Sequence, residues 1–187
     1  MVRTAQDDQL VPELATVFRA HGYDGASLAL ISEAVGLQKS SLYHRFPGGK
    51  AQMARAVLSA MLEQLRESLF ADLHTADAGN VRERLDAVAT GVGEFYDQGR
   101  RWCVLETMSL GGRLGPEGDR LLAELAAAWI AALAAAAQAA GVEPREARRR
   151  ARDVLVELEG SLVLARVSDD PSAFRELIAE FPERLCR

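Results

Sequence analysis

LQKSSLYHRFPGGK, residues 37–50, is the stretch that decides the fold of this chain. It gathers Lys, Ser, Tyr and His within a few positions and then stops at an aromatic residue, a Pro and two Gly. An exposed loop and a short helix that offers polar groups to an anion both fit this composition. Because Phe46-Pro47-Gly48-Gly49 breaks a helix, the run predicts a short helix from about Lys39 to Arg45.

Two more helices are predicted upstream of this run. Apolar residues at helical spacing predict the first from about Asp7 to His21, with Gly22 as its stop. Ser27 is expected to cap the N-terminus of a second, short helix that ends at Gly36. Two short helices joined by a Gly-containing turn form a helix-turn-helix, whose second helix enters the major groove of DNA.

The polar face of the third helix supplies the predicted DNA contacts. Base edges are expected to meet the side chains at positions 38, 39, 40 and 44, and phosphates those at positions 41 and 43. Lys50 opens a helix after two Gly, where free N–H groups favour an anion, and Ser27 can touch a phosphate as well as cap its helix. The predicted DNA-binding residues are Ser27, Gln38, Lys39, Ser40, Ser41, Tyr43, His44 and Lys50.

Charge supports a local interface rather than a polycationic protein. The whole chain has a formal net charge of -5. Between Ser27 and Arg55 there are four basic residues and one acid, Glu33, so this segment carries 4 − 1 = +3, which suits phosphate contacts. The alternative interpretation is a solvated polar face with ordinary surface charges.

The rest of the chain also predicts helices, and no segment shows the alternation of a strand. The expected helices run from Ala51 to about Leu73, over 81–95, 102–110 and 119–140, from Pro144 to about Val167, and onward from Asp170. The fold class is therefore all-α. A three-helix DNA-binding domain is expected over residues 1–50 and a larger helical domain over residues 51–187.

The last two helices carry apolar stripes that a single body is not expected to cover. Pairing each stripe with its symmetry mate would form a four-helix interface in a homodimer. The predicted dimerisation residues are Val154, Leu158, Leu162, Phe174, Leu177, Ile178 and Phe181.

The sequence lacks the signals of several kinds of functional site. Its two Cys are far apart and have no zinc or CxxC spacing, and its three His lie in no catalytic or metal-binding motif. We therefore expect no catalytic residues, no metal and no cofactor.

The longest apolar stretch, Ala126 to Ala137, is too short to span a bilayer, so the protein is expected to be cytoplasmic with no membrane partner. An enzyme and a helical binding module without DNA activity are the rival classes.

From about Leu10 to Leu58 the chain resembles the N-terminal segment of TetR/AcrR-type transcriptional regulators. The match includes Phe18, Gly22-Tyr23, Ser27, Ile31, Gly36, Lys39, Leu42-Tyr43, Phe46-Pro47 and Lys50, and the GGK step resembles the LmrA/YxaF-like branch. Departures are Gln38, where Ser or Thr is usual, Pro12 and Val35. They affect which operator is bound rather than whether DNA is bound.

This resemblance implies a homodimeric repressor that binds a palindromic operator and is released by a small hydrophobic effector held in the helical body. Most apolar residues there must be core, but an Ala-rich helix beside large side chains can enclose a cavity. Cys103 is either a reactive thiol at a helix start or, as we prefer, a small buried residue. The helix from Ala51 would act as the lever between effector and DNA. The predicted effector-binding residues are Met61, Leu65, Phe95, Tyr96, Trp102, Cys103, Met108 and Trp129.

Overall fold

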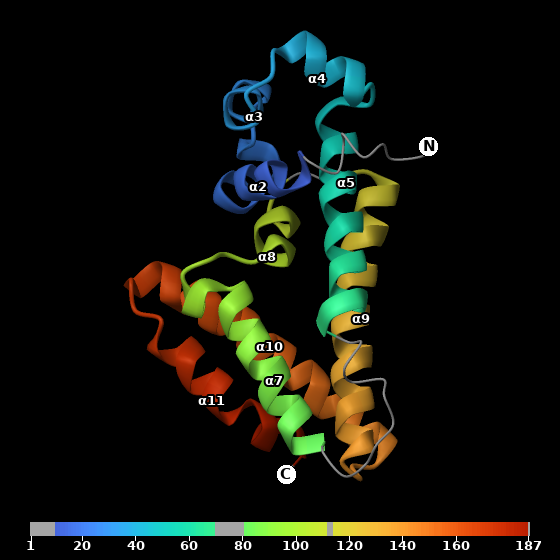
Figure 1. Ribbon diagram of the computed structural model, residues 1–187, viewed down its shortest axis with the longest axis vertical. Coiled ribbons are helices and arrows are strands. Elements are labelled where there is room, and N and C mark those ends of the chain that lie inside the picture. Colours follow the sequence, from blue (N-terminus) through green and yellow to red (C-terminus); the bar gives the residue numbers. More distant parts are fainter. Residues whose placement is uncertain (1–9, 70–80, 112–113, 187) are drawn as a thin grey trace. The chain divides into compact units, whose positions relative to one another are not determined.

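The computed structural model describes residues 10–69, 81–111 and 114–186, and its regular structure in these ranges is helical, without a β-strand (Figure 1). The all-α class is therefore confirmed. The elements are α2 (Val11–Gly25), α3 (Leu28–Ala34), α4 (Lys39–Arg45), α5 (Gly49–Gln64), the π-helical turn η1 (Leu65–Leu69), α7 (Val81–Phe95), the 3-10 turn η3 (Asp97–Gly99), α8 (Val104–Ser109), α9 (Pro116–Ala139), α10 (Pro144–Ser168) and α11 (Ser172–Cys186).

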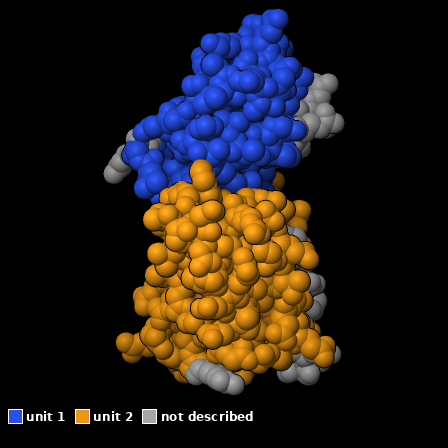
Figure 2. Space-filling model, turned by 90° about the vertical axis from the view of Figure 1, so that its left-hand side faces the viewer, with its two compact units in different colours: residues 1–62, 104–125 blue, residues 63–103, 126–187 orange. Residues whose placement is uncertain are grey.

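The chain divides into two compact units, coloured separately in Figure 2. Unit 1 comprises residues 1–62 and 104–125, and unit 2 comprises residues 63–103 and 126–187. The polypeptide therefore passes between the units at three points, one of which lies inside α9. The predicted domain boundary at residue 50 concerns function and stays a prediction.

The three N-terminal helices, which we call the head, have bounds close to the predicted ones. α2 contains Pro12 in its first turn, where a missing N–H costs little, and residues 7–9 of its predicted range lie outside the described residues. Gly22 interrupts the helical backbone with φ 65° and ψ −176°, a conformation that a residue with a Cβ rarely adopts. The stop predicted at Gly22 is thus present as a kink, and α2 continues to Gly25 beyond it.

The turn between α3 and α4 closes through local hydrogen bonds. Ser27 caps α3, because its Oγ accepts the amide proton of Leu30 at 3.2 Å. At the other end Gly36 is left-handed, with φ 66°. The Leu37 amide donates to the Ser32 carbonyl at 3.1 Å, and the Ser32 hydroxyl donates back to the Leu37 carbonyl. Both the predicted cap and the predicted glycine stop are confirmed.

α5 is shorter than the helix predicted from Ala51 to Leu73. It starts at Gly49 and ends at Gln64, and the chain continues as the π-helical turn η1 to Leu69. The remainder of the predicted range, 70–73, lies outside the described residues.

In unit 2, α11 packs against both α10 and α7 (Figure 1). The aromatic ring of Tyr96 sits in this core, edge-on to the ring of Phe174 with 6.0 Å between centroids. Pro144 is in the first turn of α10 as predicted, where Glu143 accepts the amide protons of Arg145 and Glu146. Asp170 accepts the amide proton of Ser172 at 2.9 Å and so caps α11, which runs onward from Asp170 as predicted.

This packing contradicts the expectation that a single body leaves the last two apolar stripes uncovered. The side chains of Val154, Leu158, Leu162, Phe174, Leu177 and Phe181 are buried within one chain, and Ile178 is half-buried. The expectation was wrong because α10, α11 and α7 bury these stripes against one another. Whether the same residues take part in a dimer stays a prediction.

A different face of α10 is apolar and exposed. Val156, Leu164 and Val167 leave 64%, 57% and 77% of their surface exposed. Gly160 lies on the same face, since the spacings of four, four and three residues repeat the helical turn, and a Cβ built on it would meet no heavy atom within 4 Å.

α9 is longer than the apolar stretch that the sequence suggested. With 24 residues and a mean hydropathy of 1.7 in its most apolar window, it is long and apolar enough to cross a bilayer. A single such helix is weak evidence for a membrane span, because the core helix of a soluble protein meets the same criteria.

Candidate nucleic-acid interface

The third helix of the head separates an apolar anchor from a polar outer face. Leu42 is fully buried and Phe46 is 2% exposed, and Ile31 of α3 is buried in the same head. The side chains predicted to meet DNA are on the exposed surface: Ser27, Gln38, Lys39, Ser40, Ser41, Tyr43 and His44. α4 therefore presents a continuous polar face while its apolar side holds it to the protein.

Gln38 stands at the N-cap of α4 without capping it. Its backbone is extended, with φ −66° and ψ 152°, and its side chain makes no capping hydrogen bond within the described head. The departure from Ser or Thr at this position thus leaves the longer amide of Gln38 exposed beside Lys39. An exposed amide at this end of α4 suits contact with a base or a phosphate.

Lys50 differs from the other predicted contacts because its ammonium is engaged within unit 1. Its Nζ donates to the carbonyl oxygens of Tyr23 at 2.7 Å and Asp24 at 3.3 Å. It also lies 4.6 Å from the centroid of the Tyr23 ring. The partners are 27 and 26 residues away in the chain, so the local sequence around Lys50 gave no signal for them.

The charge of the interface is also lower than the composition suggested. Arg55, one of the four basic residues counted above, has its Nε 3.1 Å from Oε2 of Glu117 at the start of α9. Glu117 lies far outside the counted segment, so the local sum of +3 omitted it. Lys39 remains as the exposed cation on the outer face of α4.

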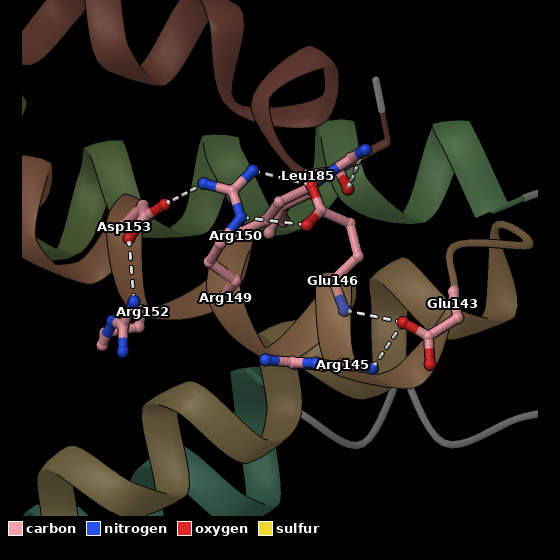
Figure 3. A network of polar contacts seen from close by, with 8 residues as sticks. All are labelled: Glu143, Arg145, Glu146, Arg149, Arg150, Arg152, Asp153 and Leu185. Carbon is pink, nitrogen blue, oxygen red and sulfur yellow. Dashed lines mark hydrogen bonds and ion pairs between the residues drawn. The ribbon is translucent and has the colours of Figure 1, made fainter.

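Some arginines of the second basic run, Arg145 to Arg152, pair with acids of the same helix (Figure 3). Glu146 pairs with both Arg149 and Arg150, at 2.7 and 2.8 Å, and Arg149 also pairs with Asp153 at 2.8 Å. The guanidinium of Arg149, and after it that of Arg150, holds the pKa of Glu146 at about 2. This network fits a solvated helix face.

The predicted effector residues are divided between the two units. Met61 and Met108 belong to unit 1, and the other six belong to unit 2. Within unit 2 the Tyr96 hydroxyl is 3.3 Å from the Cys103 sulfur, and both side chains are buried. Burial of Cys103 agrees with its interpretation as a small core residue. Trp129 and Leu65 are buried, Phe95 and Trp102 are half-buried, and the guanidinium carbon of Arg166 lies 5.1 Å from the centroid of the Trp102 ring.

Comparison with known proteins agrees with this geometry. Residues 14–57 match the family model described as "Bacterial regulatory proteins, tetR family". Over 62 residues, a third of each chain, the sequence is 34% identical to the HTH-type transcriptional regulator LmrA of Bacillus subtilis (strain 168). Over 95% of this chain and 96% of the relative, it is 27% identical to an uncharacterised HTH-type transcriptional regulator of Mycobacterium tuberculosis (strain ATCC 25618 / H37Rv).

The fold is likewise shared with a solved structure. A TetR transcriptional regulator from Legionella pneumophila superimposes with a TM-score of 0.83 over 100% of both chains, at 16% sequence identity. At that identity the likeness concerns the fold.

Proposed function

Since the chain belongs to the TetR family and is a DNA-binding transcriptional regulator rather than an enzyme, we propose that it acts as a homodimeric repressor in the cytoplasm. It binds a palindromic duplex operator, and a small hydrophobic effector releases it. The observation that carries the DNA-binding mode is the outer face of α4, where polar side chains are exposed above the buried Leu42 and Phe46.

In this proposal the residues of α4 divide the work of recognition. Gln38, Lys39, Ser40 and His44 read base edges, whereas Ser41 and Tyr43 contact phosphates, with Ser27 at the start of α3 as a further phosphate contact. Two heads read two half-sites about one helical turn apart, or more.

The test is a selection of bound duplexes from a random pool, followed by a mobility-shift assay with the selected duplex. A recovered palindrome that the protein binds more tightly than the random pool supports the proposal. Recovery of no enriched duplex would contradict sequence-specific binding.

The dimer is proposed to form through the exposed apolar face of α10, defined by Val156, Gly160, Leu164 and Val167. Val156, Leu164 and Val167 gain burial when a second copy covers them. Gly160 has open space above it, which lets two helix backbones approach closely. A two-fold axis at Gly160 would pair Val156 of one copy with Leu164 of the other, so the face is complementary to itself.

Charge along α10 supports an antiparallel arrangement of the two copies. Residues 145–153 contain five Arg and two acids, a sum of +3, whereas α10 is followed by Asp169 and Asp170. About an axis at Gly160, the basic start of each helix would face the acidic end of the other, and opposite charges favour that register.

The effector is proposed to bind in unit 2, where five of the predicted residues are aromatic or sulfur-containing: Phe95, Tyr96, Trp102, Cys103 and Trp129. α5 would transmit its effect, because it begins shortly after α4 in unit 1 and continues directly into η1, which belongs to unit 2. An effector need supply a coupling of about 1–3 kcal/mol, or roughly 5–150-fold in DNA affinity.

Reciprocity gives the test of release. Operator DNA must weaken effector binding by the factor by which the effector weakens DNA binding. Hydrophobic aromatic compounds are titrated while Trp fluorescence is followed, with and without the selected duplex. Equal affinity of a bound compound in both titrations would contradict release by that compound.

A further inference from the structure

The turn at the end of α2 is held from two sides within unit 1. Lys50, the second residue of α5, donates to the carbonyl oxygens of Tyr23 and Asp24 at 2.7 and 3.3 Å. Its ammonium also lies over the Tyr23 ring, and that ring is stacked on Phe18 with 6.4 Å between centroids and 16° between planes. The stacking of the half-buried Tyr23 ring on the fully buried Phe18 ring thus fixes the partner of this cation.

The kink at Gly22 makes these carbonyl groups available. The last carbonyl groups of a helix have no partner within the helix, and a cation is favoured beside them. Because the backbone of Gly22 is not helical, the chain beyond it can place the carbonyl groups of Tyr23 and Asp24 toward Lys50. The link therefore combines two charge-assisted hydrogen bonds with a cation–π contact.

α8 occupies the other side of the same turn. A Cβ built on Gly22 would lie 2.8 Å from the carbonyl oxygen of Thr107, closer than real side-chain contacts allow. The atom in the way is backbone, so it cannot swing aside. α2 and α8 pack extensively against each other, and Gly22 is therefore required by both its conformation and its neighbour.

We infer that Lys50 is a positioning residue for DNA binding: it ties the start of α5 to the turn Gly22–Asp24 and so fixes the position of α4 relative to α2. The connection to α4 is short. The Gly49 amide donates to the Phe46 carbonyl at 2.8 Å, and Phe46 directly follows α4. Holding Lys50 in place consequently holds the C-terminal end of the recognition helix.

This role differs from a phosphate contact, which any DNA-facing lysine could supply. A phosphate contact acts only when DNA is present and contributes about 0.9 to the slope of log affinity against log salt. A positioning role acts in the free protein. The inference builds on the proposed recognition by α4, but its decisive measurement needs no DNA, so the two can fail separately.

The experiment compares Lys50→Met, which keeps the aliphatic stem, with Arg55→Met, which removes the same charge from the same helix. Hydrogen exchange of the free full-length protein is followed at the amides of Leu42 and Phe46, with amides of α10 as an internal reference. We expect Lys50→Met to speed exchange at Leu42 and Phe46 by about tenfold relative to α10. Arg55→Met should leave the ratio unchanged, because its partner Glu117 leaves 64% of its side chain exposed and the ion pair is therefore weak.

Salt titration of binding to the selected duplex adds the second readout. Lys50→Met should lower affinity while the slope stays that of the wild type. Unchanged exchange at Leu42 and Phe46 would overturn the inference, whether or not affinity falls. A slope lowered by about 0.9 per protomer with unchanged exchange would make Lys50 a phosphate contact instead.

A second pair of variants tests the other side of the turn. Gly22→Ala meets both a strained backbone and the Thr107 carbonyl, whereas Gly115→Ala meets strain alone, since φ is 84° and no heavy atom lies within 4 Å of the new Cβ. Only Gly22→Ala should speed exchange at Leu42 and Phe46 relative to α10. Equal effects of the two variants would contradict a contribution from α8, and Lys50→Met still decides the role of Lys50 if Gly22→Ala does not fold.

Discussion

Leu42 and Tyr43 are consecutive residues of α4, yet Leu42 is fully buried while Tyr43 leaves 48% of its surface exposed. The two side chains therefore serve different ends, one holding the helix and the other facing outward. Substitutions at these adjacent positions should separate folding from binding.

Tyr43→Phe should weaken binding to all duplex sequences by a similar factor, because a lost phosphate contact carries no sequence information, and should leave the salt slope unchanged, because a neutral hydroxyl releases no counterions. The melting temperature should stay within about 1 °C of the wild type, since the exposed hydroxyl contributes little to folding. Fluorescence anisotropy at several salt concentrations measures the affinity and the salt slope, and thermal unfolding measures the melting temperature. Unaltered binding by Tyr43→Phe would remove Tyr43 from the interface.

Leu42→Ala should instead lower the free energy of unfolding by about 2–5 kcal/mol, because it leaves a cavity where a fully buried side chain was. Urea unfolding measures this loss. A stability equal to that of the wild type would mean that α4 is not anchored through Leu42.

Ser27→Ala should cost about 1 kcal/mol of stability, because the amide proton of Leu30 loses its acceptor. Ser27→Gly is the matched comparison and should cost only a few tenths of a kcal/mol, since Gly is a better N-cap than Ala. Thermal unfolding of both variants tests the order. If Ser27→Ala costs no stability, the hydroxyl does not act as a cap in solution.

Leu164→Glu should convert a dimer into monomers, because it places two charges beside the proposed two-fold axis at Gly160. Leu110→Glu is the control. Leu110 is 58% exposed and Leu164 is 57% exposed, so both changes replace an equally exposed leucine by a carboxylate. Sedimentation velocity should find monomers only for Leu164→Glu, with weaker operator binding as a consequence. A dimer that survives Leu164→Glu would place the interface on another surface.

The stability of unit 2 should depend on the charge of Glu146. Arg149 and then Arg150 hold its pKa at about 2 in the folded chain, below the ordinary value of 4.5. The unfolded chain therefore binds a proton at a higher pH than the folded chain does. The contribution of Glu146 is complete above about pH 4.5 and is lost as the pH falls toward 2.

Glu146→Gln tests this dependence. The gap in melting temperature between wild type and variant should be widest above pH 5 and should close toward pH 2. High salt should narrow the gap at every pH, because exposed ion pairs are screened. A gap that does not change with pH would mean that the Arg149–Glu146–Arg150 pairing does not persist in solution.

The head could be predicted closely from sequence because its signals are local. The N-cap at Ser27, the left-handed Gly36 and the break after Phe46 each act within a few residues, and the predicted bounds of α4 agree with the structure. The engagement of Lys50 could not be predicted in this way. Its partners lie in α2, and nothing near Lys50 in the sequence distinguishes a carbonyl-bound ammonium from one that faces DNA.

The faces of α10 show a second limit of sequence reading. The helix has one apolar stripe through Val154 and Leu158 and another through Val156 and Leu164. Periodicity finds both, but only the packing of α11 decides which stripe is covered within the chain. The stripe through Val154 and Leu158, which the sequence predicts as the dimer surface, is the one that the chain itself buries.

The composition of unit 1 has a consequence for the exchange of parts between homologous proteins. Since α8 packs on α2 and its Thr107 carbonyl faces Gly22, the segment 1–62 forms one compact unit with residues 104–125. A chimaera that takes only the N-terminal segment from a relative would pack the relative's α2 against an α8 of different sequence. Transplanting both segments together should preserve the donor's operator preference, so the natural unit of recombination here is discontinuous in the gene.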